Sequence, residues 1–192
     1  CNPYTNVVGQ LINDGTVDSK GRHAVRTYTG NIEVNGGNIK SESLLDGIWT
    51  SSTGNITVTG GTITGGTNGV VTTGTGTITI TGGVITGYNG NAVAELGPET
   101  SVITIGNNED TDIANKTSPV LIGNIIGVKS SESTFNFYDG VIKGAEGNSV
   151  SGTVTDVQPG YGIQKTTADE IETAILVEAN YLNTTSNSYY AK

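Results

Sequence analysis

The amino-acid sequence predicts an all-β fold, a right-handed parallel β-helix of about six coils followed by a β-rich C-terminal cap segment. Three observations predict it. The chain of 192 residues has 29 glycines, two phenylalanines and no methionine. A short pattern of Ile, Val, Thr and Gly returns several times along it. The apolar residues keep the same places in every copy, which is typical of a solenoid.

The composition favours strands and argues against several partners. Thr, Asn and Gly are poor helix formers, whereas Val, Ile and Thr favour strands. Regularly spaced Ile and Val distinguish the chain from a disordered one. A formal charge of -9 argues against nucleic acid and anionic lipid surfaces, because both select Lys and Arg. The apolar runs are short, so we expect no membrane span.

The repeat is seen best in "GTITITGGVITG", which begins at Gly76. Similar copies begin at residues 30, 54 and 133, and weaker ones near residues 8 and 101. The starts are therefore 22, 24, 22, 25 and 32 residues apart. Self-similarity at such a period predicts stacked coils, each a single supersecondary unit.

Alignment of the copies predicts the inside of the solenoid. Because neighbouring strand residues face opposite sides, the apolar columns face inward and the intervening polar residues face outward. The first column contains Ile12 or a neighbour, then Ile32, Ile56, Ile78, Ile103 and Phe135. The second contains Val34, Val58, Ile80, Ile105 and Phe137, and the third contains Val17, Ile39, Ile63, Ile85 and Ile142.

Corners separate three short strands in each coil. Pairs such as Gly60-Gly61 and Gly82-Gly83 predict a sharp turn, since glycine accepts positive φ. A third apolar strand follows, at Ile48 and Val70 among others. Hairpins would not explain columns that match at one full period, and parallel strands joined by crossovers favour right-handed winding.

Two places interrupt the repeat. We expect β-helix coils over residues 1–152, with an insertion loop at 106–120 that projects from the side. Residues 153–182 are expected to form a C-terminal cap or transition segment with strands of its own. Residues 183–192 form the tail. Long insertions in solenoids often carry binding.

The segment "STFNFYDGVIKG", followed by "GTVTDVQPGYGIQ", resembles the ends of repetitive right-handed β-helix regions in large extracellular proteins of gut-type Gram-positive bacteria. The resemblance implies an extracellular or cell-surface location and an adhesin-like or structural role. It implies no catalytic residues. It covers most of the chain.

The candidate ligand-binding residues are few. Aromatic side chains that would stack on a glycan are Trp49, Tyr88 and Tyr138; for Trp49 we favour packing over exposure. The loop acids are Glu109, Asp110 and Asp112, which lack the spacing of a calcium loop, so we expect a solvated loop and no metal or cofactor.

An enzyme is the less favoured interpretation. Sugar-cleaving β-helices need grouped carboxylates on one outward face, but here that column holds Glu33 followed by Thr57, Thr79, Thr104 and Asn136. His23, the only histidine, is expected to be a corner or surface residue. The short Thr array also makes an ice-binding plane a minor alternative.

The ends of the solenoid suggest self-association or contact with neighbouring modules of a longer chain. Natural proteins normally cover open strand edges, so the terminal segments are candidates for end-to-end assembly of a surface filament. The residues concerned are Cys1, Tyr4, Val7, Val8, Tyr189 and Tyr190. The alternative is a monomeric adhesin that binds glycans through the 106–120 loop and the aromatic residues.

Overall fold

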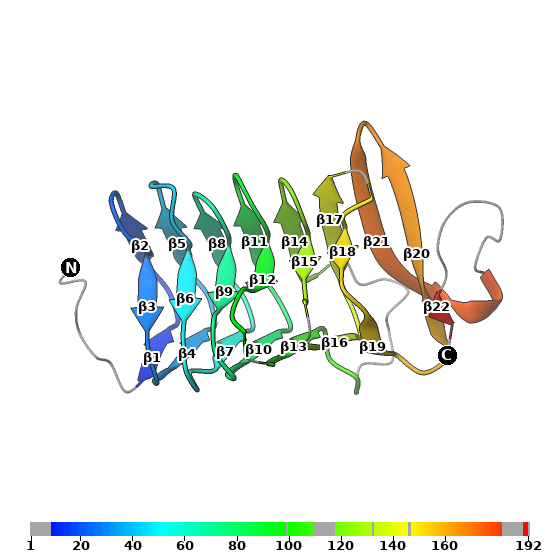
Figure 1. The fold of residues 1–192 in the computed structure, drawn as a ribbon, viewed down its shortest axis with the longest axis horizontal. Coiled ribbons are helices and arrows are strands. Elements are labelled where there is room, and N and C mark those ends of the chain that lie inside the picture. Colours follow the sequence, from blue (N-terminus) through cyan, green and yellow to red (C-terminus); the bar gives the residue numbers. More distant parts are fainter. Residues whose placement is uncertain are drawn as a thin grey trace.

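The computed structural model is a parallel β-helix of six coils, each built from three strands. The coils lie side by side along the long axis of the molecule and end beside a long hairpin, as Figure 1 shows. The structure describes residues 9–98, 100–109, 118–131, 133–145, 147–181 and 190–191. The predicted fold class is therefore confirmed. Within these residues, no helix has the length and hydropathy needed to cross a membrane.

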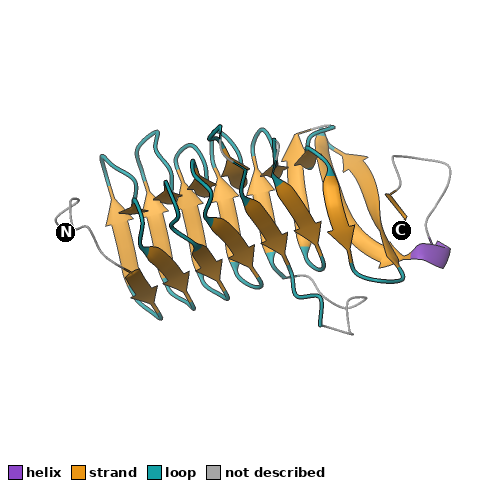
Figure 2. Cartoon of the chain, turned by 60° about the horizontal axis from the view of Figure 1, so that its bottom comes forward, coloured by secondary structure: helices purple, strands orange, loops and turns teal. Residues whose placement is uncertain are grey.

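The strands form three sheets, named A, B and C, which Figure 2 shows as separate layers around one core. Sheet A contains β1 (Gly9–Ile12), β4 (Asn31–Val34), β7 (Ile56–Val58), β10 (Thr77–Ile80), β13 (Val102–Ile105), β16 (Thr134–Phe137) and β19 (Val154–Val157). Sheet C contains β3 (Val25–Thr27), β6 (Ile48–Thr50), β9 (Val70–Thr72), β12 (Val93–Glu95), β15 (Val128–Lys129) and β18 (Val150–Ser151).

Sheet B combines the remaining coil strands with the C-terminal segment. Its parallel strands are β2 (Thr16–Ser19), β5 (Asn38–Ser41), β8 (Thr62–Gly65), β11 (Val84–Gly87), β14 (Val120–Gly123) and β17 (Val141–Ala145). Three antiparallel strands follow in the order β21 (Ile171–Glu178), β20 (Tyr161–Ala168) and β22 (Tyr190–Ala191). A short 3-10 helix, η2 (Ala179–Tyr181), comes after β21.

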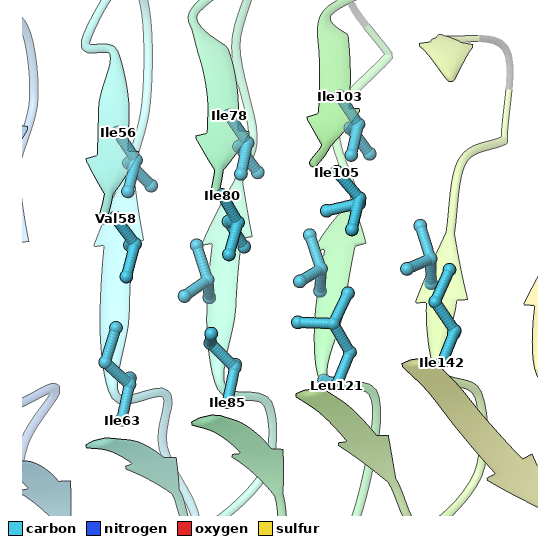
Figure 3. Close-up of a cluster of buried hydrophobic side chains, with 14 of the residues drawn as sticks. Ile56, Val58, Ile63, Ile78, Ile80, Ile85, Ile103, Ile105, Leu121 and Ile142 are labelled. Atoms are coloured by element: carbon cyan, nitrogen blue, oxygen red, sulfur yellow. The ribbon is translucent and has the colours of Figure 1, made fainter. Parts of the chain in front are cut away.

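The strand register confirms the predicted columns. Ile56 pairs with Ile32 on one side and Ile78 on the other, and their side chains are buried. The same stacking continues through the labelled residues of Figure 3, whose side chains point into the core from successive coils. Two details differ from the expectation: Ile12 pairs with Val34 of the second column, and Leu121 supplies the fifth coil's missing member of the third column.

The corner between sheets A and B requires glycine, as predicted. Gly61 and Gly83 have φ values of 86° and 87°, which side chains rarely adopt. A Cβ on Gly83 would also lie 2.6 Å from the carbonyl oxygen of Gly61 in the preceding coil. The coils stack about 4.8 Å apart, so the corner has no room for a side chain that points along the axis.

The predicted insertion lies at this corner in the fifth coil. Strand β13 of sheet A ends at Ile105, and Gly106 follows with a φ of 86°. The next strand, β14 of sheet B, begins at Val120. Residues 110–117 of the insertion lie outside the described part of the chain. The stacking therefore tolerates the insertion, because β14 returns to register with β11.

A ladder of polar side chains stabilises the corner between sheets B and C. The backbone and side-chain nitrogens of Asn68 both donate to Asp46 Oδ1, at 3.2 and 2.8 Å. Asn91 repeats the arrangement one coil later, with both nitrogens 2.9 Å from Asn68 Oδ1. Each side chain thus satisfies the backbone of the next coil, as buried polar groups require.

The C-terminal segment closes the core. Strand β21 runs antiparallel to β17, and β20 pairs with β21 along its whole length. Their inward side chains, Ile163, Ala174 and Leu176, join the hydrophobic core. The segment predicted to be a cap therefore packs as one, while β19 still stacks in parallel on β16 beyond the expected boundary at residue 152.

One charged side chain, Glu172, also faces inward in this cap. Its Oε1 accepts a hydrogen bond from the Ser149 backbone N–H at 3.0 Å and another from the Ser149 hydroxyl, and lies 3.1 Å from Lys165 Nζ. Burial by itself raises the pKa of the Glu172 carboxyl, but the bonds from Ser149 and the Lys165 ammonium outweigh it and lower that pKa. The carboxylate is therefore stabilised in its charged form.

Candidate functional site

A groove on the outer face of sheet B is the main candidate site. Its floor comes from the outward positions of three stacked strands, Thr86 on β11, Ile122 on β14 and Lys143 on β17, which pair directly in the register. Because neighbouring strand residues alternate, the inward positions beside them, such as Ile85 and Leu121, fill the core. The solenoid repeat therefore places the three floor residues on successive coils.

Glycine shapes one side of the groove. Gly87 and Gly123 end their strands and Gly144 is the penultimate residue of β17, and a Cβ at each would lie 1.7 to 2.0 Å from a carbonyl oxygen of the corner that follows. The chain therefore turns tightly there, and the next residues, Tyr88 and Asn124, leave the sheet beside the groove. The pattern of glycine at these positions is what presents Tyr88 outward.

The tip of the C-terminal hairpin also lines the groove, beside the end of β17, because Ala145 pairs with Ile171 of β21. Asp169 and Glu170 connect β20 to β21 in two residues, with φ values of 51° and 63°. This geometry is the one preferred in tight hairpins, but it is unusual for a glutamate. Strained backbone is found disproportionately at functional sites, and this strained glutamate lines the groove.

The groove has a volume of about 710 Å³, which lies within the range of ligand-binding clefts. Tyr88 is 69% exposed, so most of its ring is available for stacking. Around it lie two amide side chains, Asn89 and Asn124, one ammonium group and two carboxylates. The Asn89 side-chain nitrogen donates to the Gly66 carbonyl at 2.7 Å, which fixes the amide and leaves its oxygen as an acceptor.

This mixture suits a ligand that has both apolar faces and many hydroxyl groups. The aromatic ring and Ile122 offer apolar contact, whereas amide, ammonium and carboxylate groups donate to or accept from hydroxyls. Asp169 and Glu170 are exposed and adjacent on a single turn. They do not flank a bond from two sides, as the carboxylates of a glycosidase do.

The structure separates the residues that the sequence proposed for binding. Tyr88 lies in the groove, on sheet B. Trp49 is half-buried on the outer face of sheet C, opposite Arg26. It does pack, as favoured, but against His23, Arg26 and Tyr28 rather than over the core.

Tyr138 is 9% exposed, and its hydroxyl donates to Asp156 Oδ2 at 3.1 Å. Burial, followed by that carboxylate, raises the pKa of Tyr138. The ring therefore has little surface to offer a ligand. Its position is that of a packing residue between β16 and β19.

The loop acids and the chain ends are only partly described. Glu109 is exposed, and its backbone N–H donates to Asn107 Oδ1 at 3.1 Å. Asp110 and Asp112 lie outside the described residues, as do Cys1, Tyr4, Val7, Val8 and Tyr189. Tyr190 lies in β22, where it pairs with Ile163 of β20. Within the described ranges, no three His, Cys, Asp or Glu side chains gather as metal ligands would.

Sequence reasoning missed Asn89, Asn124, Lys143, Asp169 and Glu170. The repeat contained a signal for Asn124, since it occupies the place of Tyr88 one coil later. The hairpin tip gave none, because its position depends on β21 reversing direction against β17.

No protein-family model, curated protein or solved structure matches this chain. The fold and the groove define a class, a parallel β-solenoid with a capped C-terminal end and a lateral cleft. The resemblance to bacterial surface repeats stays a prediction from the sequence.

Proposed function

We propose that the protein is an extracellular adhesive β-helix that binds carbohydrate in the groove beside Tyr88. The observation that carries the proposal is the convergence of an exposed aromatic ring with amide, ammonium and carboxylate groups in one open cleft of about 710 Å³. A saccharide matches this chemistry, since its C–H faces stack on aromatic rings and its hydroxyls use the polar groups. The rigid coils hold the groups in place, which lowers the entropic cost of binding.

The openness of the groove favours a chain-like ligand over a small enclosed one. The floor extends across β11, β14 and β17, so a ligand contacts three successive coils at spacings of about 4.8 Å. A sugar unit is of comparable size to this step. An oligosaccharide therefore fits the repeat better than a single sugar.

The test is a glycan-array screen of the purified protein, followed by calorimetric titration of the best neutral oligosaccharide. Tyr88→Ala is expected to weaken binding roughly fivefold, because loss of an aromatic contact costs about 1 kcal/mol, whereas Tyr88→Phe keeps most of the affinity. Leu96→Ala is the control, since Leu96 is also an exposed apolar side chain but follows β12 of sheet C, outside the groove. Absence of glycan binding, or an unchanged affinity of Tyr88→Ala, would overturn the proposal.

The same samples test the enzymatic alternative. A polysaccharide lyase or hydrolase would release unsaturated or reducing ends from the bound oligosaccharide over time. We expect the ligand to be recovered intact, because Asp169 and Glu170 are neighbours on one turn and do not form a flanking pair.

A second candidate function is assembly into an end-to-end surface filament, and the strand edges favour it. Among the described residues, β19 and β18 are the last strands of sheets A and C, and such edges recruit further strands. At this end sheet B continues into the antiparallel hairpin and ends in β22, so a neighbouring molecule would add at the other two sheets, or exchange β22. Removal of residues 1–8 or 183–192 is expected to abolish filaments in electron micrographs; filaments that survive both truncations would exclude this mode.

A further inference from the structure

A second cluster of chemically distinctive side chains lies on the outer face of sheet C, in the first two coils. Arg26 on β3 and Trp49 on β6 are direct partners in the register. Their strand neighbours, such as Val25 and Ile48, are buried in the core, so alternation directs the two side chains outward. Tyr28 and His23 flank β3 and complete the cluster.

The guanidinium of Arg26 is held by aromatic rings. Its Cζ lies 4.6 Å from the ring centre of Tyr28 and 4.6 Å from that of Trp49. The two rings meet at 82°, with centres 5.6 Å apart, so they form the two walls of a corner. The Arg26 Nη2 also donates to the Tyr28 hydroxyl. Cation–π contacts and this hydrogen bond orient the guanidinium without neutralising its charge.

His23 holds the Trp49 side of the cluster in place. Its ring stacks on Trp49, with centres 5.7 Å apart and an interplanar angle of 28°. Its Nδ1 lies 3.2 Å from Asp46 Oδ2, the carboxylate at the start of the polar ladder. The indole is therefore fixed by the corner of the solenoid, and the site is anchored to the rigid coils.

Arg26 forms no ion pair with a carboxylate of the described residues. Lys20, Lys40 and Lys165 each lie within 4.0 Å of a glutamate, whereas among the described residues no carboxylate lies that close to Arg26. The Arg26 Nε is buried without a hydrogen-bond partner. The chain has a formal charge of -9, yet the positive charge of this fixed guanidinium is not neutralised by a carboxylate. The guanidinium is therefore suited to bind an anionic ligand.

We propose that this cluster binds the carboxylate group of an acidic saccharide. The planar fork of Arg26 suits a carboxylate, which accepts two parallel hydrogen bonds. The Tyr28 ring is 50% exposed and offers an apolar surface beside the bound charge. That combination matches a uronic-acid sugar, whose carboxylate and C–H face are adjacent. The site lies on a different sheet from the groove, so this proposal does not depend on whether the groove binds carbohydrate.

Trp49 makes the site directly measurable, because it is the chain's only tryptophan and its fluorescence reports on this cluster alone. The probes are an oligogalacturonate and the same oligosaccharide with its carboxylates methyl-esterified. We expect a saturable fluorescence change with the acid and at least tenfold weaker binding of the ester. Equal responses to acid and ester, or no response to the acid, would overturn the proposal.

Substitutions test the role of the guanidinium. Arg26→Lys keeps the charge but loses the planar fork, so we expect at least a tenfold loss of affinity for the acid. Arg26→Gln should lose binding, while Lys20→Gln, which removes one charge from the same coil, should leave it unchanged. Thermal unfolding shows that each variant is folded. An Arg26→Gln variant that is folded and binds the acid normally would contradict the assignment.

A final arm distinguishes the saccharide from a free anion. Acetate and inorganic phosphate are titrated under the same conditions, and both are expected to be at least tenfold weaker than the oligogalacturonate, because they lack the face that stacks on Tyr28. Tyr28→Ala should remove that advantage. Binding of acetate or phosphate as tight as that of the oligosaccharide would reject a saccharide site.

Discussion

The Glu172 carboxylate accepts a hydrogen bond from the Ser149 backbone N–H at 3.0 Å, in the place that a carbonyl oxygen occupies in the coils before it. The equivalent N–H groups donate to the carbonyl of the next coil, also at 3.0 Å, in the pairs Gly47 to Asn68, Gly69 to Asn91 and Gly127 to Asn148. Beyond Ser149 this stack of backbone bonds ends. The side chain of Glu172 therefore substitutes for the backbone of a seventh coil.

Glu172→Ala is expected to lower the free energy of unfolding by about 2 kcal/mol, because the buried Ser149 N–H loses its acceptor. Glu172→Gln retains an amide oxygen that accepts the same bond, so we expect a smaller loss. Urea denaturation followed by circular dichroism measures both. Equal losses for the two variants would mean that charge, rather than acceptance from Ser149, is what stabilises this end.

The same carboxylate predicts a pH dependence. Because the pKa of Glu172 is lowered in the folded protein, its stabilisation is present above the unfolded value of about 4.3 and is lost as the pH falls through the folded pKa. The difference in unfolding free energy between the native protein and Glu172→Gln should therefore shrink from pH 6 to pH 3. Glu178→Gln, at the exposed end of β21, is the control, and the prediction fails if its profile matches that of Glu172→Gln.

The columns of inward side chains were predictable because each stacked coil places the same types of residue at the same positions. Ile56 and Ile78 bury the same atoms against the same neighbours, so alignment of the sequence with itself reveals the core. The glycine corners were predictable for the same reason, since positive φ and close coil contact both exclude side chains. Where an inward column changes little from coil to coil, sequence suffices.

The sites were predictable only in part, because they depend on contacts outside the repeat. Tyr88 was named from its residue type, but the groove beside it requires the hairpin tip at Asp169 and Glu170. Trp49 was expected to pack, yet its partners became known only when the register placed Arg26 opposite it. Inward Glu172 is hidden among alternating apolar residues and pairs with Ser149, which is 23 residues away.

The glycine at the corner between sheets A and B gives a further test. Gly83→Ala is expected to cost at least about 2 kcal/mol of unfolding free energy, since the new Cβ combines an unfavourable φ with a clash against Gly61. Gly15→Ala, with a φ of 93° but no atom within 4 Å, should cost less, and Gly21→Ala, in open space, should be near neutral. Any other order of the three would show that coil contact does not set the glycine requirement.

The polar ladder should resist substitution at its middle position. Asn68→Ala removes the acceptor for both nitrogens of Asn91 and one donor to Asp46, so we expect a loss of roughly 2 kcal/mol in unfolding free energy. Asn38→Ala, at an exposed position of β5, is the matched control and should change stability by less than about 0.5 kcal/mol. Similar small effects for both would indicate that the ladder is incidental to stability.

The hairpin tip predicts an opposition between stability and binding. Glu170 adopts a φ of 63°, which costs about 1 to 2 kcal/mol for a residue with a side chain. Glu170→Gly creates the Asp-Gly pair preferred in two-residue hairpins, so the free energy of unfolding should rise by up to about 1 kcal/mol after the extra unfolded-state entropy of glycine is subtracted. The variant also removes a carboxylate from the groove. Its affinity for the oligosaccharide that binds beside Tyr88 should therefore fall even as its Tm rises.

Glu170→Gln, which keeps the strain but replaces the carboxylate with an amide, separates the two effects: we expect no gain in Tm and an intermediate affinity. If Glu170→Gly raises Tm and leaves that affinity unchanged, the strained glutamate serves no role in the groove.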